Sequence, residues 1–298
     1  MKHSQPSRTA EIVAAWRAAE ALKPADERVC YDPLAQAFLG SLYANLGRFA
    51  WLRKIGLWYS DRKAPGGVGT IVVRTRYIDE YLNTCMDDGI GQLVILGAGY
   101  DSRPYRFDAL RDKVRVFEVD YPTTQTVKKK RVRGILNGLP DHVVYVPVDF
   151  DRERIDKRLL ESGYDPELKT LFIWEGVTTY LTADAVDKTL AFVAENSGKG
   201  SSIIFSYIFR SAADGTCTLK GANTWRKALV KRGEPPTFGI EADAVEEFLY
   251  KRGFCKVKNV TMEFLKAAYF NEKNQDRQVF SWAGIVYATV DHSNRAHL

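Results

Sequence analysis

The stretch Gln92-Leu-Val-Ile-Leu-Gly-Ala-Gly-Tyr-Asp-Ser-Arg103 decides the fold of this chain. Residues 93–96 are a short apolar run that is β-branched in its middle and stops at Gly97-Ala98-Gly99. This pattern is typical of a buried parallel strand that enters a tight turn. Glycine at positions 97 and 99 lets the backbone turn sharply and lets a ligand approach main-chain N–H groups.

A second strand is expected some twenty residues further along. Val114-Arg-Val-Phe-Glu-Val119 has the composition of a strand and is followed directly by Asp120. A carboxylate at the tip of the second strand, beside the glycine turn of the first, is where a Rossmann-type site accepts hydrogen bonds from a ribose. A lone Gly-x-Gly fits an ordinary strand–helix turn equally well. The two strands together favour a nucleoside site.

Composition limits the class of protein and the kinds of partner. The 298 residues permit one large domain or two small ones, and 45% hydrophobic with 27% charged residues is ordinary for a globular protein. Because the four cysteines show no Cys-x-x-Cys spacing, we expect reduced thiols and no metal site. With neither an apolar leader nor a run of membrane-spanning length, we expect a cytoplasmic protein.

The net charge of +6 is compatible with acidic partners but does not establish one. The dense basic cluster Lys128-Lys-Lys-Arg-Val-Arg133 lies in an expected helix and is interpreted as a solvated helix face. Few aromatic residues accompany it, so a stacking surface for bases is not indicated. We therefore expect a small-molecule partner and neither a nucleic acid nor a membrane.

Residues 1–88 are interpreted as a helical N-terminal extension that covers a sheet domain formed by residues 89–298. Residues 8–22 are amphipathic, Asp32-Pro33 is a helix-starting pair, and residues 42–59 are rich in apolar and aromatic side chains. After a glycine-rich break a helix is expected over residues 70–86, with Arg74 and Arg76 near its beginning. A helical cover of this kind excludes water from a nucleotide site.

From residue 92 onward, strands and helices alternate, which predicts right-handed crossovers and a parallel α/β sheet covered on both faces. After the fifth strand we expect an inserted lid at residues 208–240 and a helix at residues 241–252. Two late strands in a terminal hairpin would complete the Rossmann-like, seven-stranded, mostly parallel sheet of a class I methyltransferase. The expected strands are residues 92–96, 114–119, 143–148, 170–174, 201–207, 256–263 and 279–290, and the helices between the first five are near residues 122–137, 152–161 and 182–197.

In such a sheet, ligands bind at the carboxyl ends of the strands. Asp120 would accept from ribose hydroxyls, Asp149 would accept from an adenine amino group, and Phe150 would lie against the ring. Glu175 would hold an ammonium, and Arg74 a carboxylate through its guanidinium fork. The ligand that fits this rim is half nucleoside and half amino acid. The candidate rim residues are Gly97, Ala98, Gly99, Asp120, Tyr121, Asp149, Phe150, Glu175, Gly176 and Tyr207.

Several blocks of the chain resemble those of the leucine carboxyl methyltransferase family, in particular its bacterial branch of small-molecule O-methyltransferases. The resemblance implies S-adenosyl-L-methionine as cofactor. It assigns Arg74 to the cofactor carboxylate, Gly97 to its methionine portion, Asp120 to the ribose, Asp149 and Phe150 to adenine, and Glu175 to the amino acid end. The region after the fifth strand shows no clear counterpart of the protein-modifying members, so the acceptor stays open. The blocks are residues 93–103, Phe117-Glu-Val-Asp-Tyr-Pro122, Ile173-Trp-Glu-Gly-Val-Thr-Thr-Tyr-Leu181, Val73-Arg-Thr-Arg76, and Thr9-Ala10, Arg17, Glu20 and Asp32-Pro33.

Methyl transfer depends mainly on holding nucleophile, methyl group and sulfur in line. A carboxylate acceptor needs no general base, whereas a hydroxyl profits from one, and the four histidines all fall in expected loops or termini. We therefore expect catalysis by orientation, with Tyr180 and Tyr207 as acceptor contacts or, equally, as packing residues. An NAD(P)-dependent oxidoreductase is the nearest alternative, although it usually has a third glycine where this chain has Ser102. The second alternative is a non-catalytic module that binds S-adenosylmethionine.

Overall fold

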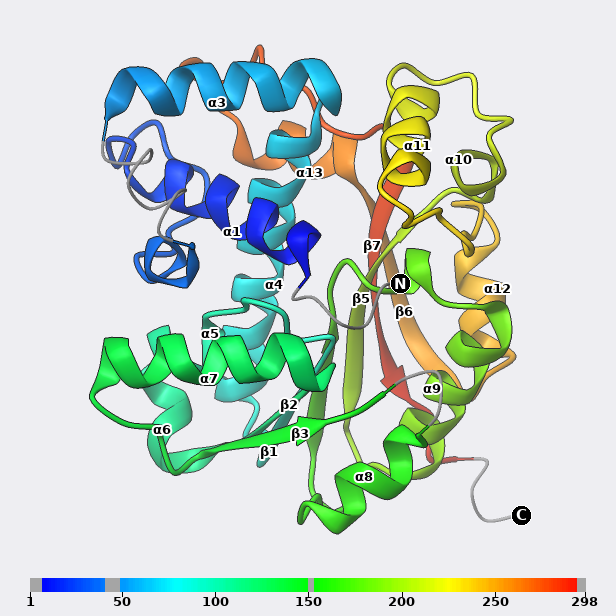
Figure 1. The fold of residues 1–298 in the computed structure, drawn as a ribbon. Coiled ribbons are helices and arrows are strands. Elements are labelled where there is room, and N and C mark those ends of the chain that lie inside the picture. Colours follow the sequence, from blue (N-terminus) through cyan, green and yellow to red (C-terminus); the bar gives the residue numbers. More distant parts are fainter. Residues whose placement is uncertain (1–6, 41–48, 150–152, 294–298) are drawn as a thin grey trace.

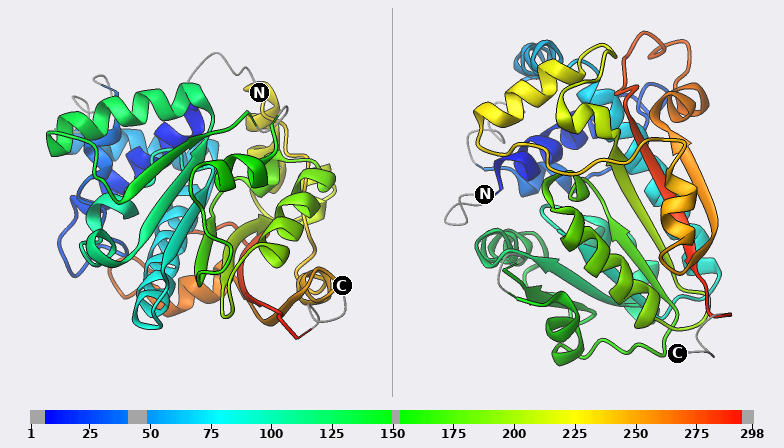
Figure 2. Two further views of the ribbon diagram at one scale, coloured as in Figure 1. Left: turned by 90° about the horizontal axis from the view of Figure 1, so that it is seen from below. Right: turned by 90° about the vertical axis from the view of Figure 1, so that its right-hand side faces the viewer.

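The computed structural model describes residues 7–40, 49–149 and 153–293, and these form one seven-stranded sheet with helices on both faces (Figures 1 and 2). The strand order is β3-β2-β1-β4-β5-β7-β6. The strands are β1 (Gln92–Leu96), β2 (Arg115–Asp120), β3 (Val143–Pro147), β4 (Thr170–Trp174), β5 (Ser202–Ile208), β6 (Phe254–Thr261) and β7 (Ala283–Val290).

The first five strands are all parallel, and β7 pairs antiparallel with both β5 and β6. The α/β fold with a mostly parallel, seven-stranded sheet is therefore confirmed. The order reverses between β1 and β4, so the carboxyl ends of these two strands flank the point where an open α/β sheet binds its ligand.

The last two strands pair antiparallel, as expected of a terminal hairpin, but a long connection joins them. Helix α13 (Met262–Tyr269) and a loop separate β6 from β7, and β7 begins at Ala283 rather than at residue 279. Thr261 caps α13, because its hydroxyl accepts from the amide of Phe264, and this local cap ends the strand. The β-prone aromatic residues Phe280 and Trp282 are buried in the core before the strand begins.

The helices lie in two layers (Figure 2). They are α1 (Arg8–Ala21), η1 (Ala35–Phe38), α3 (Ala50–Lys63), α4 (Gly67–Asp87), α5 (Arg103–Arg106), α6 (Ala109–Lys113), α7 (Pro122–Leu136), α8 (Ile155–Glu161), η2 (Thr178–Tyr180), α9 (Ala183–Glu195), α10 (Arg210–Asp214), α11 (Ala222–Lys231), α12 (Val245–Tyr250) and α13. Leu93 and Ile95 of β1 belong to one apolar cluster with α1, α4 and α13, whereas Val94 and Leu96 belong to a second cluster with α8, α9 and α12. The alternation of side chains along a strand produces this division.

The N-terminal helices share the core of the sheet. Helix α4 carries buried Val72, Ile78 and Leu82 in the same cluster as β1 and β4, so it packs directly on the sheet. Asp32 accepts from the amide of Ala35 at 3.0 Å, as a cap would, but the chain then forms only the short η1. Residues 42–48 of the apolar stretch at 42–59 lie outside the described residues, and residues 50–59 belong to α3.

The segment between β5 and β6 folds as short helices. Helices α10 and α11 lie within residues 208–240, and the helix expected at residues 241–252 is the shorter α12. The insertion contacts η2, after β4, where the amide of Thr237 donates to the carbonyl of Thr179 at 2.8 Å, and it returns to β5 where the amide of Ile240 donates to the carbonyl of Ile208 at 3.0 Å. In the part of the chain that the structure describes, no helix has both the length and the apolar character needed to cross a membrane.

Candidate functional site

The glycine turn is fastened to the neighbouring strand. Gly97 and Gly99 adopt φ angles of +69° and +43°, which favour glycine. The amides of Gly97 and Ala98 both donate to the carbonyl of Val119, at 2.8 and 3.0 Å. This places the turn directly beside the carboxyl end of β2.

Asp120 completes this link. Its Oδ2 accepts from the amide of Gly99, and its Oδ1 accepts from the amide of Tyr121 at 2.6 Å. The side chain is 8% exposed, and burial raises the pKa of Asp120, while the two amide donors oppose the rise. The carboxylate expected to bind the ribose therefore stands at the edge of the turn, in a fixed orientation.

Arg74 and Glu175, which the sequence assigned to opposite ends of an amino acid ligand, form an ion pair. Nε of Arg74 donates to Oε1 of Glu175 at 2.8 Å, and the side chains are 10% and 9% exposed. Of the described residues, only Glu175 pairs with this guanidinium, and Nη1 and Nη2 point toward Gly176, where an added Cβ would lie 3.5 and 3.4 Å from them. The terminal nitrogens are thus placed at the rim.

Arg103 is the centre of this cluster, and the sequence did not assign it a role. Its guanidinium is 2% exposed and contacts Asp79 at 2.7 Å, Asp101 at 2.6 Å and Glu175 at 2.7 Å. Burial alone would raise the pKa of Glu175, but Arg103, Arg74 and Arg17 hold it below its ordinary range. The only signal for Arg103 was its place at the end of the stretch 92–103, because two of its three partners, Asp79 and Glu175, lie far away in the sequence.

The N-terminal helix contacts the turn directly. A Cβ at Gly99 would lie 3.2 Å from Ala10 of α1. Arg17 of the same helix donates to the carbonyl of Tyr100 at 2.6 Å and pairs with the buried Asp32 at 2.9 Å. Helix α1 therefore closes over the loop after β1, in the position expected of a cover.

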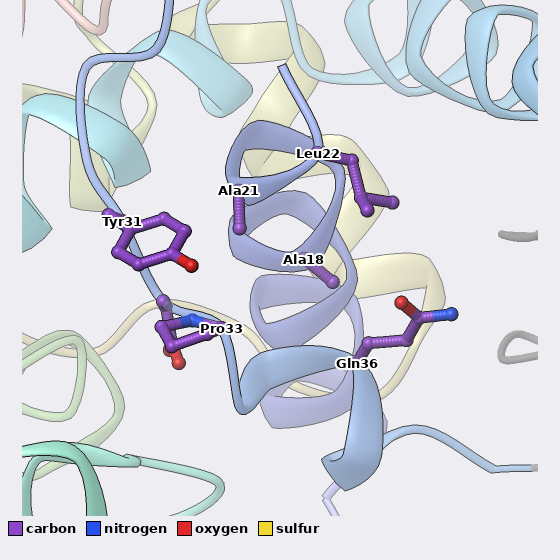
Figure 3. Close-up of a pocket in the computed structure, with 7 residues that line it drawn as sticks. Ala18, Ala21, Leu22, Tyr31, Pro33 and Gln36 are labelled. Atoms are coloured by element: carbon purple, nitrogen blue, oxygen red, sulfur yellow. The ribbon is translucent and has the colours of Figure 1, made fainter. Parts of the chain in front are cut away.

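A pocket of about 210 Å³ lies at the far end of α1, between that helix and residues 31–36 (Figure 3). None of the rim residues lines it. Its wall is formed by Ala18, Ala21, Leu22, Tyr31, Asp32, Pro33 and Gln36. The pocket is therefore separate from the turn that the sequence analysis identified.

Of the remaining rim residues, Asp149 and Tyr121 are half-buried. Asp149 follows β3, and its amide donates to Glu153 at 2.8 Å. Tyr121 lies beside Asp120. Phe150 lies outside the described residues, so its expected contact with a base stays a prediction.

The two candidate tyrosines lie in different surroundings. Tyr180 is near Arg74, Glu234 and Thr9, and burial, followed by Glu234, raises the pKa of its phenol. Thr9 donates to Glu234 at 2.7 Å, which joins α1 to the insertion next to Tyr180. Tyr207 instead donates to Asn259 of β6 at 2.8 Å and is 2% exposed. These contacts give Tyr207 a packing role and do not support a role in catalysis.

Replacing Gly97 by alanine should disturb both the fold and the site. The new Cβ would lie 2.4 Å from Cγ2 of Val177, and the alanine would have to adopt a positive φ. The φ angle alone costs about 1–2 kcal/mol, and the contact with Val177 adds to it. We expect a larger loss of unfolding free energy than for Gly89→Ala, which has a φ of +75° but no atom within 4 Å. Urea denaturation of both variants measures the difference, and equal losses would contradict the close contact.

Comparison with known proteins identifies the family. The family model described as "Leucine carboxyl methyltransferase" matches residues 10–194. A Bacillus subtilis (strain 168) protein named "Putative S-adenosyl-L-methionine-dependent methyltransferase YktD" is 29% identical over 224 residues, covering 74% of this chain and 72% of that protein. A Streptomyces coelicolor (strain ATCC BAA-471 / A3(2) / M145) protein, named "Putative S-adenosyl-L-methionine-dependent methyltransferase SCO7813", is 35% identical, covering 65% of this chain and 66% of its own length, slightly less than two thirds.

Among solved structures, the crystal structure of a "putative methyltransferase" from Thermobifida fusca YX is 12% identical and covers 97% of both chains, with a TM-score of 0.61. At this identity the likeness shows the fold alone. The family model covers more than half of the chain and includes the glycine turn, Asp120, Asp149 and Glu175. The chain belongs to the leucine carboxyl methyltransferase family.

Proposed function

We propose that this chain, a methyltransferase by family, uses S-adenosyl-L-methionine to methylate a carboxylate or hydroxyl oxygen of a small molecule. One observation carries the proposal: a candidate ribose acceptor and a candidate carboxylate-binding arginine lie at the same edge of the sheet. Asp120 stands at the glycine turn, and Arg74, with its terminal nitrogens at Gly176, stands one strand away. A nucleoside that carries an amino acid requires both.

The residues at the rim fit this cofactor. Asp120 and Asp149 would accept from the nucleoside, and Arg74 would pair with the carboxylate of the methionine portion. Glu175 would face the ammonium, although Arg74 and Arg103 already neutralise it and weaken its attraction for a cation. When bound, the cofactor supplies an electrophilic methyl group on a sulfonium sulfur. The protein contributes orientation and the exclusion of water beneath α1.

The surroundings of Tyr180 favour a carboxylate over a hydroxyl acceptor. A phenol is protonated at neutral pH, and the raised pKa of Tyr180 further disfavours the phenolate that would act as a base, so Tyr180 acts as a hydrogen-bond donor. Of the histidines in the described ranges, His142 contacts the carbonyl of Pro104 and His292 that of Gly198, so neither is directed at the rim. An acceptor that is already ionised needs no base and profits from a donor beside Arg74.

Changing Tyr180 to phenylalanine should therefore weaken acceptor binding without weakening cofactor binding. We expect the KM for the acceptor to rise, and the rate at low acceptor concentration to fall, roughly tenfold, the effect of losing one hydrogen bond to a charged acceptor. The matched control is Tyr207→Phe, which loses its bond to Asn259 and should lower only stability, by about 1 kcal/mol. A rate loss in the control and none in Tyr180→Phe would reverse the roles of the two tyrosines.

Two measurements test the proposal in sequence. Calorimetry should detect binding of S-adenosylmethionine and not of NAD(H) or NADP(H). Incubation with the labelled cofactor and panels of carboxylic acids and phenols, followed by mass spectrometry, should then yield a methyl ester or ether. Binding without any methylated product from these panels or from a metabolite extract would support a non-catalytic binding module instead.

A further inference from the structure

A lysine lies buried beneath the glycine turn. Lys128 of α7 is 1% exposed. It is the first residue of the basic cluster at 128–133, for which the sequence predicted a solvated helix face. That prediction is wrong for Lys128 because it shares the inward face of α7 with Thr124 and Val132, at a spacing of four residues. A lysine is almost never buried to this degree unless it is paired.

The partner of Lys128 is a second buried charge. Its Nζ lies 2.7 Å from Oε1 of Glu118 in β2, and the two side chains are 1% and 0% exposed. The hydroxyl of Tyr105 donates to the same carboxylate oxygen at 3.0 Å. Replacing such a pair by apolar groups often leaves stability unchanged or raised, so stability alone does not account for it.

The second contact of Lys128 suggests what the pair does. Nζ also donates to the carbonyl oxygen of Ala98 at 3.3 Å, the central residue of the glycine turn. The same carbonyl accepts from the amide of Asp101 at 2.8 Å, while the amide of Ala98 is held by Val119. Within the described residues, Lys128 is the side chain that holds this carbonyl, and Figure 1 shows α7 alongside the sheet below α1.

We propose that Lys128, anchored by Glu118, is a positioning residue of the cofactor site, which fixes the orientation of the Ala98 peptide and so prepares the turn for S-adenosylmethionine. The inference rests on the proposed function, because it concerns how the same turn binds its ligand. A preformed turn lowers the entropic cost of binding, so its loss appears as weaker affinity.

The test uses a double variant that keeps volume and removes both charges. Glu118→Gln/Lys128→Met should stay folded, whereas Lys128→Met alone leaves a buried carboxylate unpaired and should lower the melting temperature. By calorimetry, the double variant should bind S-adenosylhomocysteine about tenfold more weakly than the unmodified chain. Amide hydrogen exchange of a peptide spanning residues 97–101 should be faster as well.

The control is another buried pair that does not touch the turn. Arg277 contacts Glu20 at 2.9 Å, with side chains 19% and 1% exposed, so Glu20→Gln/Arg277→Met should change the melting temperature but not the affinity. Equal affinity in the Glu118/Lys128 double variant and the unmodified chain would overturn the positioning role and leave the proposed function intact. Failure of the unmodified chain to bind S-adenosylmethionine or S-adenosylhomocysteine would instead contradict the proposed function.

Discussion

Replacing Asp120 by asparagine should raise the dissociation constant for S-adenosylmethionine about a hundredfold while leaving the fold intact. The carboxylate would provide two charge-assisted acceptors for the ribose, and each such bond contributes about 1.5 kcal/mol or more. Asparagine keeps one acceptor for the amides of Gly99 and Tyr121 but turns an NH₂ group toward one donor. Calorimetry with the cofactor and with S-adenosylhomocysteine measures the loss.

The matched control for this change is Asp108→Asn. Asp108 precedes α6, and its side chain is 84% exposed, so neither affinity nor stability should change by more than a few tenths of a kcal/mol. If Asp120→Asn binds the cofactor within about threefold of the unmodified chain, the ribose is held elsewhere, since one good hydrogen bond is worth more than that.

Replacing Arg103 by methionine should cost about 3–5 kcal/mol of unfolding free energy, the penalty for leaving a buried charge unpaired. Asp101 would lose its ion-pair partner, while Glu175 would keep only Arg74 and Asp79 only Arg106. Urea denaturation near neutral pH measures the loss. Arg76→Met, which breaks an exposed pair with Glu80 on α4 and removes the stacking of the guanidinium on Tyr269, should cost no more than about 1 kcal/mol.

The cost of Arg103→Met should also depend on pH. In the unmodified chain the arginines hold the pKa of Glu175 below its ordinary value, against the effect of burial. That carboxylate therefore contributes stability above about pH 4.3, the value of an unfolded glutamate, and loses it as the pH falls further. In the variant the carboxylates take up protons at higher pH, so the two chains should converge in stability on acidification. A constant difference between pH 7 and pH 4 would contradict this account.

Local patterns predicted most of the sheet. The bounds of β1 and β4 agree with the prediction, β3 ends one residue early, and β2 and β5 are each shifted by one residue. Short apolar runs that end at Gly97 or at an acidic residue are strong signals, because a buried strand and its turn depend on neighbouring residues. The terminal region was less predictable, since the cap at Thr261 competes with a strand that the composition also allows.

The site shows the same division. Ligands bind at the carboxyl ends of parallel strands, and this rule selected Asp120, Asp149 and Glu175 as candidates. Each stands at the end of a strand or within two residues of it, at the same edge of the sheet. It did not find Arg103 as the partner of Glu175, 72 residues away, or Lys128 as the partner of Glu118. The four-residue spacing to Val132 places Lys128 on the inward face of α7, but the sequence does not show the partner that a buried lysine needs.

The sequence by itself determined the parallel α/β fold, the glycine turn, the acidic residue after it and the family, because each depends on residues that are close together in the chain. Only the tertiary structure decided that Arg74 and Glu175 form a pair around Arg103, that Tyr180 and not Tyr207 lies near Arg74, and that Lys128 supports the turn. These facts depend on which side chains meet across the sheet. Packing and the pairing of buried charges determine that, and neither has a local signature in the sequence.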